Sequence, residues 1–262
     1  MERKKLVITG HARTGTTALS DLLNIDGRLF ITPECHQFLP EMNAQNIYIN
    51  TTAKSNVLRM NKMFERHNLT WSDLWPENAK RSKFNQWLHK NLPKSVEYIG
   101  DKTPRPYLHN IKQIIQKSEY DISIIICIRD GRDCVISKFW GNSAYPHTMK
   151  IQDHNSNKVF DTGRNKIVES WISSMKIIQN LLLNENKIKY KIIRYEDSCE
   201  NPYQTVEDIS EFLGLSECLK IEKHQYRPVN KQIWRKKFPD MSNDISKRYP
   251  EFQELLDYFD YV

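Results

Sequence analysis

The stretch VITGHARTGTTALSDLL at residues 7–23 passes from an apolar run, through a turn of small residues, into an amphipathic helix. The apolar run breaks at Gly10, and leucines at helical spacing begin at Leu19. A strand, a glycine turn and a helix in this order aim backbone N–H groups and the positive end of the helix dipole at one spot. The stretch therefore predicts an anion-binding loop; the alternative is an ordinary tight turn.

The side chains of this loop favour an oxyanion without a metal ion. Arg13 supplies a charged fork, and Thr14, Thr16 and Thr17 supply hydroxyl donors around Gly15. Nucleotide-hydrolysing loops place Lys and then Ser or Thr after the last glycine, the latter to hold magnesium. Because Thr16 stands in the lysine position, we expect a different anionic ligand and no metal requirement.

The remaining chain predicts a parallel α/β sheet. The 262 residues suffice for one domain, and helical segments separate five apolar runs of strand length. Strands that alternate with helices indicate a parallel sheet covered on both faces. The run ISIIICI reads as the buried central strand. The five runs lie at 5–9, 28–32, 96–99, 122–128 and 188–193.

Two segments interrupt this alternation. Residues 37–95 read as a helical insertion, and residues 141–163 as a long polar loop of the kind that often forms a lid or binding segment. After the loop we expect a helix over 164–184. Its apolar face would consist of Ile167, Trp171, Met175 and Ile178.

Composition narrows the class of protein. The formal charge of +7 favours anionic ligands, but the basic residues form no stripe that would indicate nucleic-acid binding. The five cysteines form no C-x-x-C pair, and the longest apolar run is too short to span a bilayer. We expect a soluble, cytoplasmic protein with no membrane or nucleic-acid partner.

A second anion site is predicted in CIRDGRDCVISKFW at residues 127–140. Arg129 leaves the most apolar strand at its carboxyl end, where ligands of open α/β sheets bind. Ser137 follows eight residues later, two helical turns on and on roughly the same face. The alternative is a salt-bridged surface turn among Arg129, Asp130, Arg132 and Asp133.

These motifs together resemble the sulfotransferases that use 3′-phosphoadenosine 5′-phosphosulfate (PAPS). The resemblance is closest to the branch with a glutamate base, which includes tyrosylprotein, carbohydrate and bacterial enzymes. It covers the whole chain, in order, through GHARTGTTALSDLL, PECHQF, GDKTPRPYLHNI, CIRDGRDCVISKFW, RYEDSCENPYQTVEDISEFLGL and RPVNKQIWRKKF.

The resemblance implies a three-layer fold like that of P-loop NTPases, with residues 1–262 as a single sulfotransferase domain. It implies that the loop residues Arg13, Gly15, Thr16 and Thr17 hold the 5′-phosphosulfate. Arg129 and Ser137 would bind the 3′-phosphate, and Tyr195 would lie near the adenine. The product would be 3′,5′-adenosine bisphosphate (PAP). In the C-terminal motif, Arg235 or Lys236 would contact the nucleotide, Lys236 being the better match.

Sulfuryl transfer requires a base for the acceptor and cations for the leaving oxygen. Glu34, just past the second strand, is our choice of base, and His36 and His109 are its rivals. The resemblance places Lys102 near the leaving oxygen, where it would act with Arg13. The alternative for Lys102 is a surface pair with Asp101.

We predict sulfuryl transfer to a hydroxyl, in preference to an amine, of a small molecule or glycan. The insertion and the loop would lie on the acceptor side. Trp71, Trp75 and Trp87 are either an acceptor platform or core residues. The alternative functions are a P-loop small-molecule or nucleoside kinase and a non-enzymatic basic module that binds nucleic acid.

Overall fold

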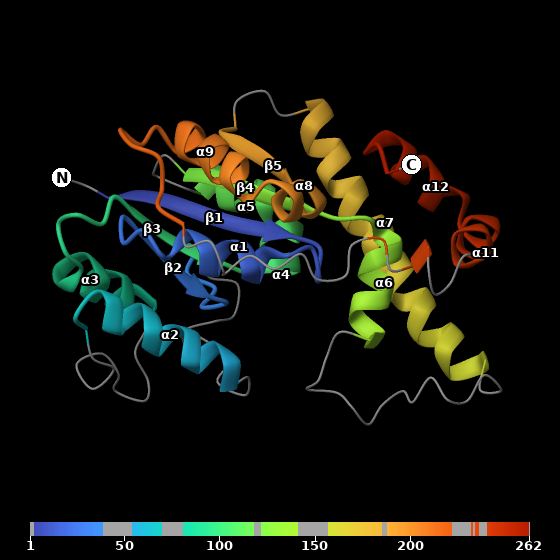
Figure 1. Ribbon diagram of the computed structural model, residues 1–262, viewed down its shortest axis with the longest axis horizontal. Helices are drawn as coiled ribbons and strands as arrows, with labels where there is room; N and C mark the ends of the chain where they lie inside the picture. The colour runs from blue at the N-terminus through green and yellow to red at the C-terminus, as the bar shows by residue number, and fades with distance from the viewer. Residues whose placement is uncertain are drawn as a thin grey trace.

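A five-stranded parallel sheet forms the centre of the molecule (Figure 1). The strand order is β2-β3-β1-β4-β5, so β1 stands in the middle. The strands are β1 (Lys4–Gly10), β2 (Leu29–Pro33), β3 (Tyr98–Lys102), β4 (Ile122–Ile128) and β5 (Tyr190–Arg194). The computed structural model describes residues 3–38, 54–69, 81–117, 122–140, 157–184, 188–221, 232, 234–235 and 240–261.

Helices cover both faces of the sheet, which confirms the predicted three-layer α/β fold. The first nine described helices are α1 (Thr16–Leu23), α2 (Lys54–Arg66), α3 (Arg81–Asn91), α4 (Pro104–His109), α5 (Ile111–Lys117), α6 (Gly131–Trp140), α7 (Asn157–Asn184), α8 (Tyr195–Glu200) and α9 (Pro202–Leu213). Near the C-terminus, α11 (Met241–Arg248) and α12 (Pro250–Tyr258) follow.

The two faces are packed by different helices because side chains alternate along each strand. On one face, Leu6 and Ile8 of β1 pack with the leucines of α1 and with Val206 and Ile209 of α9. On the other, Val7 belongs to a larger core formed with β4 and with helices α4, α5, α6, α7, α11 and α12. The sheet is thus buried on both sides, as its apolar runs predicted.

All five predicted strands are present, with boundaries shifted by at most three residues. The run ISIIICI forms β4, of which six of seven residues are buried. It lies inside the sheet but is not the central strand, because β1 separates it from β3. Periodicity reports that a strand is buried on both faces, and it does not report the strand's place in the order.

The predicted helical insertion contains α2 and α3, which pack on the β2 and β3 side of the sheet (Figure 1). Their buried residues form a third cluster with Phe30 and Ile99. Trp87 packs edge-on against Phe64 in this cluster, with ring centroids 6.2 Å apart. Trp87 is therefore a core residue, whereas Trp71 and Trp75 lie outside the described residues.

The helix expected from residue 164 begins earlier, at Asn157, so the prediction of a loop through residue 163 is wrong for its last seven residues. Once a helix is anchored by packing, extending it is far easier than nucleating it, so a polar segment can join it without apolar periodicity. The predicted apolar face is confirmed. Trp171, Met175 and Ile178 are fully buried, and Ile167 is partly buried.

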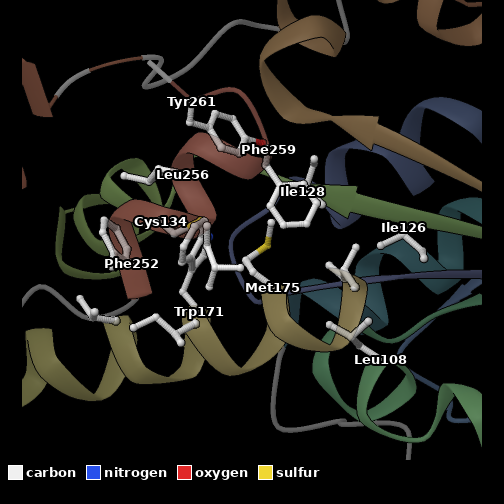
Figure 2. Packing of buried hydrophobic residues seen from close by; sticks show 14 of the residues in the cluster. Leu108, Ile126, Ile128, Cys134, Trp171, Met175, Phe252, Leu256, Phe259 and Tyr261 are labelled. Atoms are coloured by element: carbon white, nitrogen blue, oxygen red, sulfur yellow. The ribbon is translucent and has the colours of Figure 1, made fainter. Parts of the chain in front are cut away.

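The same core fixes the end of β4 (Figure 2). Trp171 of α7 packs on Phe252 of α12, with ring centroids 4.8 Å apart. The indole Nε1 of Trp171 donates a hydrogen bond of 3.0 Å to the carbonyl of Arg129. Packing between α7 and α12 thus holds the backbone from which the Arg129 side chain emerges.

Candidate active site

The carboxyl ends of the five parallel strands bring the predicted site residues to one edge of the sheet. Arg13 follows β1, Glu34 follows β2, and Lys102 ends β3. Arg129 and Tyr195 directly follow β4 and β5. Ligands of open α/β folds bind at this edge, next to the strand where the chain order reverses. Here that strand is β1, which carries the predicted anion-binding loop.

The conformation of the loop between β1 and α1 requires glycine at two positions. Gly10 (φ 149°) lies so close to β4 that a Cβ atom would come within 2.2 Å of the Cys127 carbonyl oxygen. Gly15, the residue before α1, has φ 85°, and a Cβ atom there would lie 2.4 Å from the Tyr195 ring. Thr14 closes the turn with a hydroxyl hydrogen bond of 2.7 Å to the His11 carbonyl. Side chains at either glycine would displace the surrounding structure.

The first turn of α1 presents the N–H groups that an anion can use. The N–H groups at the start of a helix have no intrahelical carbonyl partner, and the dipole adds positive potential there. Gly15 provides no side-chain cap, and the first turn of α1 contains no acidic residue. Thr16 is buried and Thr17 half-buried at this point. The start of α1 therefore has backbone N–H groups and a positive potential that suit an anion.

The two anion sites predicted separately are in direct contact. The Nε of Arg13 donates to the Ser137 hydroxyl at 3.1 Å, and Nη2 donates to the Ser137 carbonyl at 3.2 Å. Arg129 Nη1 donates to the Arg13 carbonyl at 3.1 Å. Burial and the positive charge of Arg129 lower the pKa of Arg13. An anion bound between these guanidinium groups would relieve their repulsion.

Tyr195, the first residue of α8, joins the same cluster directly after β5. The guanidinium carbon of Arg129 lies 4.1 Å from the centroid of the Tyr195 ring, a cation–π contact. Burial is the main cause that raises the pKa of Tyr195 to about 12, so the phenol is neutral at physiological pH. Tyr195 thus packs between Gly15 and Arg129, and both predicted anion sites adjoin it.

Glu34 and Lys102 form an ion pair across the ends of β2 and β3. The strand register sets Pro33 opposite Lys102, and the next N–H, that of Glu34, donates to the Lys102 carbonyl at 2.8 Å. Lys102 Nζ lies 2.7 Å from Glu34 Oε1. The lysine side chain is 1% exposed and the glutamate 30% exposed. The pair therefore has a buried cation and a carboxylate that solvent, or an acceptor, can reach.

The rival histidines differ from Glu34 in their surroundings. His36 is half-buried, with its ring centroid 6.5 Å from that of Tyr107. His109 is exposed at the end of α4, where partial burial and the charge of Arg105 lower its pKa. Of these three described residues, Glu34 is the one that contacts Lys102.

The charged residues after β4, at 129–133, are buried, so they do not form the alternative surface turn. They make two separate sets of contacts. Arg132 pairs with Asp130 at 2.9 Å and donates to the Tyr261 carbonyl, which joins α6 to the C-terminal segment. Trp234 lies over the Arg132 guanidinium at 4.0 Å. Asp133 is 4.0 Å from Arg129, and burial raises its pKa. Asp130 and Arg132 are structural, whereas Arg129 faces the loop and Tyr195.

The C-terminal predictions are only partly within the described residues. Arg235 is exposed, with its guanidinium carbon 5.3 Å from the centroid of the Trp234 ring. Lys236 lies outside the described residues.

Asp101 was considered from the sequence only as a surface partner of Lys102. It is fully buried, and its carboxylate contacts the backbone just after Glu34. An acidic residue directly after the apolar start of β3, Tyr98 to Gly100, was the signal that could have identified it.

Two features are absent from the described part of the chain. No group of three or more His, Cys, Asp or Glu side chains in it is placed to hold a metal ion. None of its helices is long and apolar enough to cross a membrane.

Comparison with known proteins identifies the family. The chain is similar to the sulfotransferase domain of the Synechococcus PCC 7002 olefin synthase, with 18% identity and a TM-score of 0.57 over 100% of this chain and 97% of that one. The sulfotransferase domain of the curacin biosynthetic pathway gives 15% identity and a TM-score of 0.57, over 100% of this chain and 99% of that one. A sulfotransferase from Alicyclobacillus acidocaldarius gives 15% identity and a TM-score of 0.54, over 99% of this chain and 96% of that one.

At these identities the solved structures establish the fold alone. No curated protein was found to match the chain. The family model described as the sulfotransferase family matches residues 5–217, which is most of the sequence. The chain therefore belongs to the sulfotransferase family.

Proposed function

We propose that the protein transfers the sulfuryl group of PAPS to a hydroxyl of a small-molecule or carbohydrate acceptor and releases PAP. Family membership supports sulfuryl transfer in general. The observation that carries the choice of donor is the contact of Arg13 with both Ser137 and Arg129 at the start of α1. A nucleotide with an anionic group on each side of its ribose suits two adjoining cationic sites.

The residues around this contact fit such a nucleotide. The N–H groups at the start of α1, with Arg13, Thr14, Gly15, Thr16 and Thr17, would hold the 5′-phosphosulfate. Gly10 and Gly15 keep the backbone free of Cβ atoms that would meet Cys127 and Tyr195.

The second anion site and the aromatic ring complete the proposed donor site. Arg129 and Ser137 would hold the 3′-phosphate, and the neutral ring of Tyr195 offers an apolar contact to a base. We propose Arg235 and Lys236 as further nucleotide contacts, because the C-terminal motif RPVNKQIWRKKF resembles that of the family.

Glu34 and Lys102 would carry the transfer chemistry. When bound, PAPS supplies an activated sulfuryl group. Glu34 accepts the proton of the acceptor hydroxyl, because its carboxylate is partly exposed and an acceptor can reach it; the contact with Lys102 holds the carboxylate in position. Lys102 and Arg13 provide the positive charge that stabilises the leaving oxygen. None of these roles requires a metal ion.

The acceptor would bind beside Glu34, where segments of the chain outside the sheet can cover it. We assign this role to the insertion at 37–95 and the segment at 141–163. The first segment follows β2, and the second follows α6, in which Ser137 contacts Arg13 of the loop after β1. These segments would determine which acceptor binds. We favour a hydroxyl acceptor over an amine, because an amine is protonated at neutral pH and a carboxylate base removes its proton less readily.

Replacement of Arg129 by methionine tests the donor site. Arg129→Met keeps a flexible side chain against Tyr195 but removes the charge and its hydrogen bonds. We expect PAP to bind roughly 10- to 100-fold more weakly, the range for loss of a charge-assisted hydrogen bond in a buried site. Binding of AMP, which lacks the 3′-phosphate, should change by less than about threefold. Isothermal titration of both nucleotides measures the difference.

Lys176→Met provides the matched control, because it removes one positive charge from an exposed pair with Glu251. It should leave both affinities unchanged within about twofold. Equal losses of PAP and AMP binding in Arg129→Met would remove the 3′-phosphate assignment. The same titration includes ATP with magnesium, and preferential binding of ATP would favour the kinase alternative.

A further inference from the structure

Asp101 is a fully buried carboxylate that receives five hydrogen bonds. Oδ1 accepts from the Thr32 hydroxyl at 2.6 Å and from the Cys35 N–H at 3.0 Å. Oδ2 accepts from the Gln37 N–H at 3.3 Å and from the Thr103 hydroxyl at 3.0 Å. The Tyr107 hydroxyl also donates to Oδ2.

Two of these donors belong to the Glu34 turn, which we define as residues 34–38. Glu34 and His36 have φ values of 57° and 56°, in the left-handed region that non-glycine residues seldom adopt. The N–H groups of Cys35 and Gln37, each following one of these residues, converge on the Asp101 carboxylate. A buried negative charge that accepts two backbone N–H groups offsets the strain and selects this turn conformation.

A third backbone group of the turn is tied to Asp101 through Tyr107. The Tyr107 hydroxyl donates to Asp101 and accepts from the Phe38 N–H at 3.1 Å. Burial and the negative charge of Asp101 raise the pKa of Tyr107 well above its usual value, so its hydroxyl stays protonated and able to donate. The turn is therefore held at Cys35, Gln37 and Phe38 by one carboxylate and its partner.

Asp101 and Lys102 are consecutive residues of β3, so they point to opposite faces of the sheet. Lys102 contacts the Glu34 carboxylate on one side. On the other side Asp101 lies opposite Thr32 of β2 and accepts a hydrogen bond from the Cys35 N–H, just after Glu34. The end of β3 thus holds both the side chain and the main chain of the Glu34 segment.

We propose that Asp101 is a positioning residue for sulfuryl transfer: it fixes the backbone of the Glu34 turn and thereby holds the Glu34 carboxylate against Lys102, ready to accept the acceptor's proton. This inference rests on the proposed function, in which Glu34 is the base. Asp101 itself touches neither donor nor acceptor in this account. It acts through Glu34.

Asp101→Asn tests the proposal with little change in volume. The amide has one acceptor oxygen and one NH2 group, so the NH2 must face the donors of Oδ1 or of Oδ2, either of which includes a turn N–H. We expect hydrogen exchange at Cys35 or Gln37, whichever N–H faces the NH2 group, to accelerate at least tenfold. The kcat for PAP release should fall roughly 10²-fold, as misplacement of a catalytic group does. The dissociation constant of PAP should stay within about twofold, because the donor site does not include this turn.

Tyr107→Phe and Thr103→Val form a milder, matched pair. Each removes one hydroxyl that donates to Oδ2 of Asp101, but only Tyr107 also accepts from the Glu34 turn. Tyr107→Phe should lower kcat by roughly tenfold and speed exchange at Phe38. Thr103→Val should leave kcat and exchange in the turn within about twofold, although it also weakens the carboxylate's hydrogen bonding. Equal kcat losses in the two variants would mean that Asp101 supports general stability, which overturns the proposal.

A cycle with Glu34→Gln separates this inference from the proposed function. If Asp101 acts through Glu34, adding Asp101→Asn to Glu34→Gln produces no further loss of kcat. Losses that multiply would overturn the positioning role. If Glu34→Gln keeps the wild-type rate, the base assignment fails, while accelerated exchange at Cys35 or Gln37 in Asp101→Asn would still establish that Asp101 fixes the turn. Unchanged exchange there would overturn the structural part of the inference, whatever the activity.

Discussion

Glu34→Gln should lower kcat for sulfuryl transfer by about 10³-fold while leaving the affinity for PAP within about threefold. Gln keeps the shape of the side chain, and its carbonyl oxygen can still accept the hydrogen bond that Lys102 donates at 2.7 Å. The amide cannot take up a proton from an acceptor hydroxyl, so only the base function is removed. PAP release from PAPS, measured across a panel of phenolic and aliphatic alcohols, gives kcat, and calorimetry gives the affinity.

The rival bases provide the controls for this prediction. His36→Asn and His109→Asn should each retain kcat within about threefold, because neither ring contacts the Lys102 ammonium among the described contacts. A wild-type rate in Glu34→Gln would eliminate Glu34 as the base. A loss of about 10³ in either histidine variant would transfer the role to that histidine.

The second large effect is expected at Lys102. Lys102→Met replaces a buried cation by a side chain of similar length, and kcat should fall roughly 10²- to 10³-fold, the usual consequence of losing one group that stabilises transition-state charge. Affinity for PAP should fall much less than kcat, because Lys102 would act on charge that develops at the leaving oxygen. The same PAP-release assay and calorimetric titration measure both quantities.

Lys176→Met again controls for the loss of one positive charge and should keep the wild-type kcat. Thermal unfolding of Lys102→Met verifies that the variant is folded. If folded Lys102→Met keeps kcat within about threefold, the ion pair with Glu34 is structural and the cation at the leaving oxygen must be another residue.

The sequence was sufficient to predict elements whose signal is local. Apolar runs predicted all five strands, and the strand, glycine turn and helix at residues 7–23 predicted the loop. The resemblance then assigned residues to it. Because parallel strands all end at one edge, sequence position alone also placed Glu34, Lys102 and Arg129 on the same side of the molecule.

Contacts between distant segments could not be predicted in this way. The hydrogen bonds from Arg13 to Ser137 join residues 124 positions apart, and they exist because α6 lies against the loop after β1. The role of Asp101 was missed for a similar reason. Its environment depends on a turn from β2 and a tyrosine from α4, and the adjacent Lys102 suggested a simple surface pair.

Isothermal titration of the unmodified protein with PAP, AMP and ATP with magnesium tests the central claim most directly. The account predicts micromolar binding of PAP and at least roughly tenfold weaker binding of AMP, because Arg129 and Ser137 serve the 3′-phosphate that AMP lacks. Binding of ATP with magnesium in the absence of PAP binding would contradict a PAPS-dependent sulfotransferase.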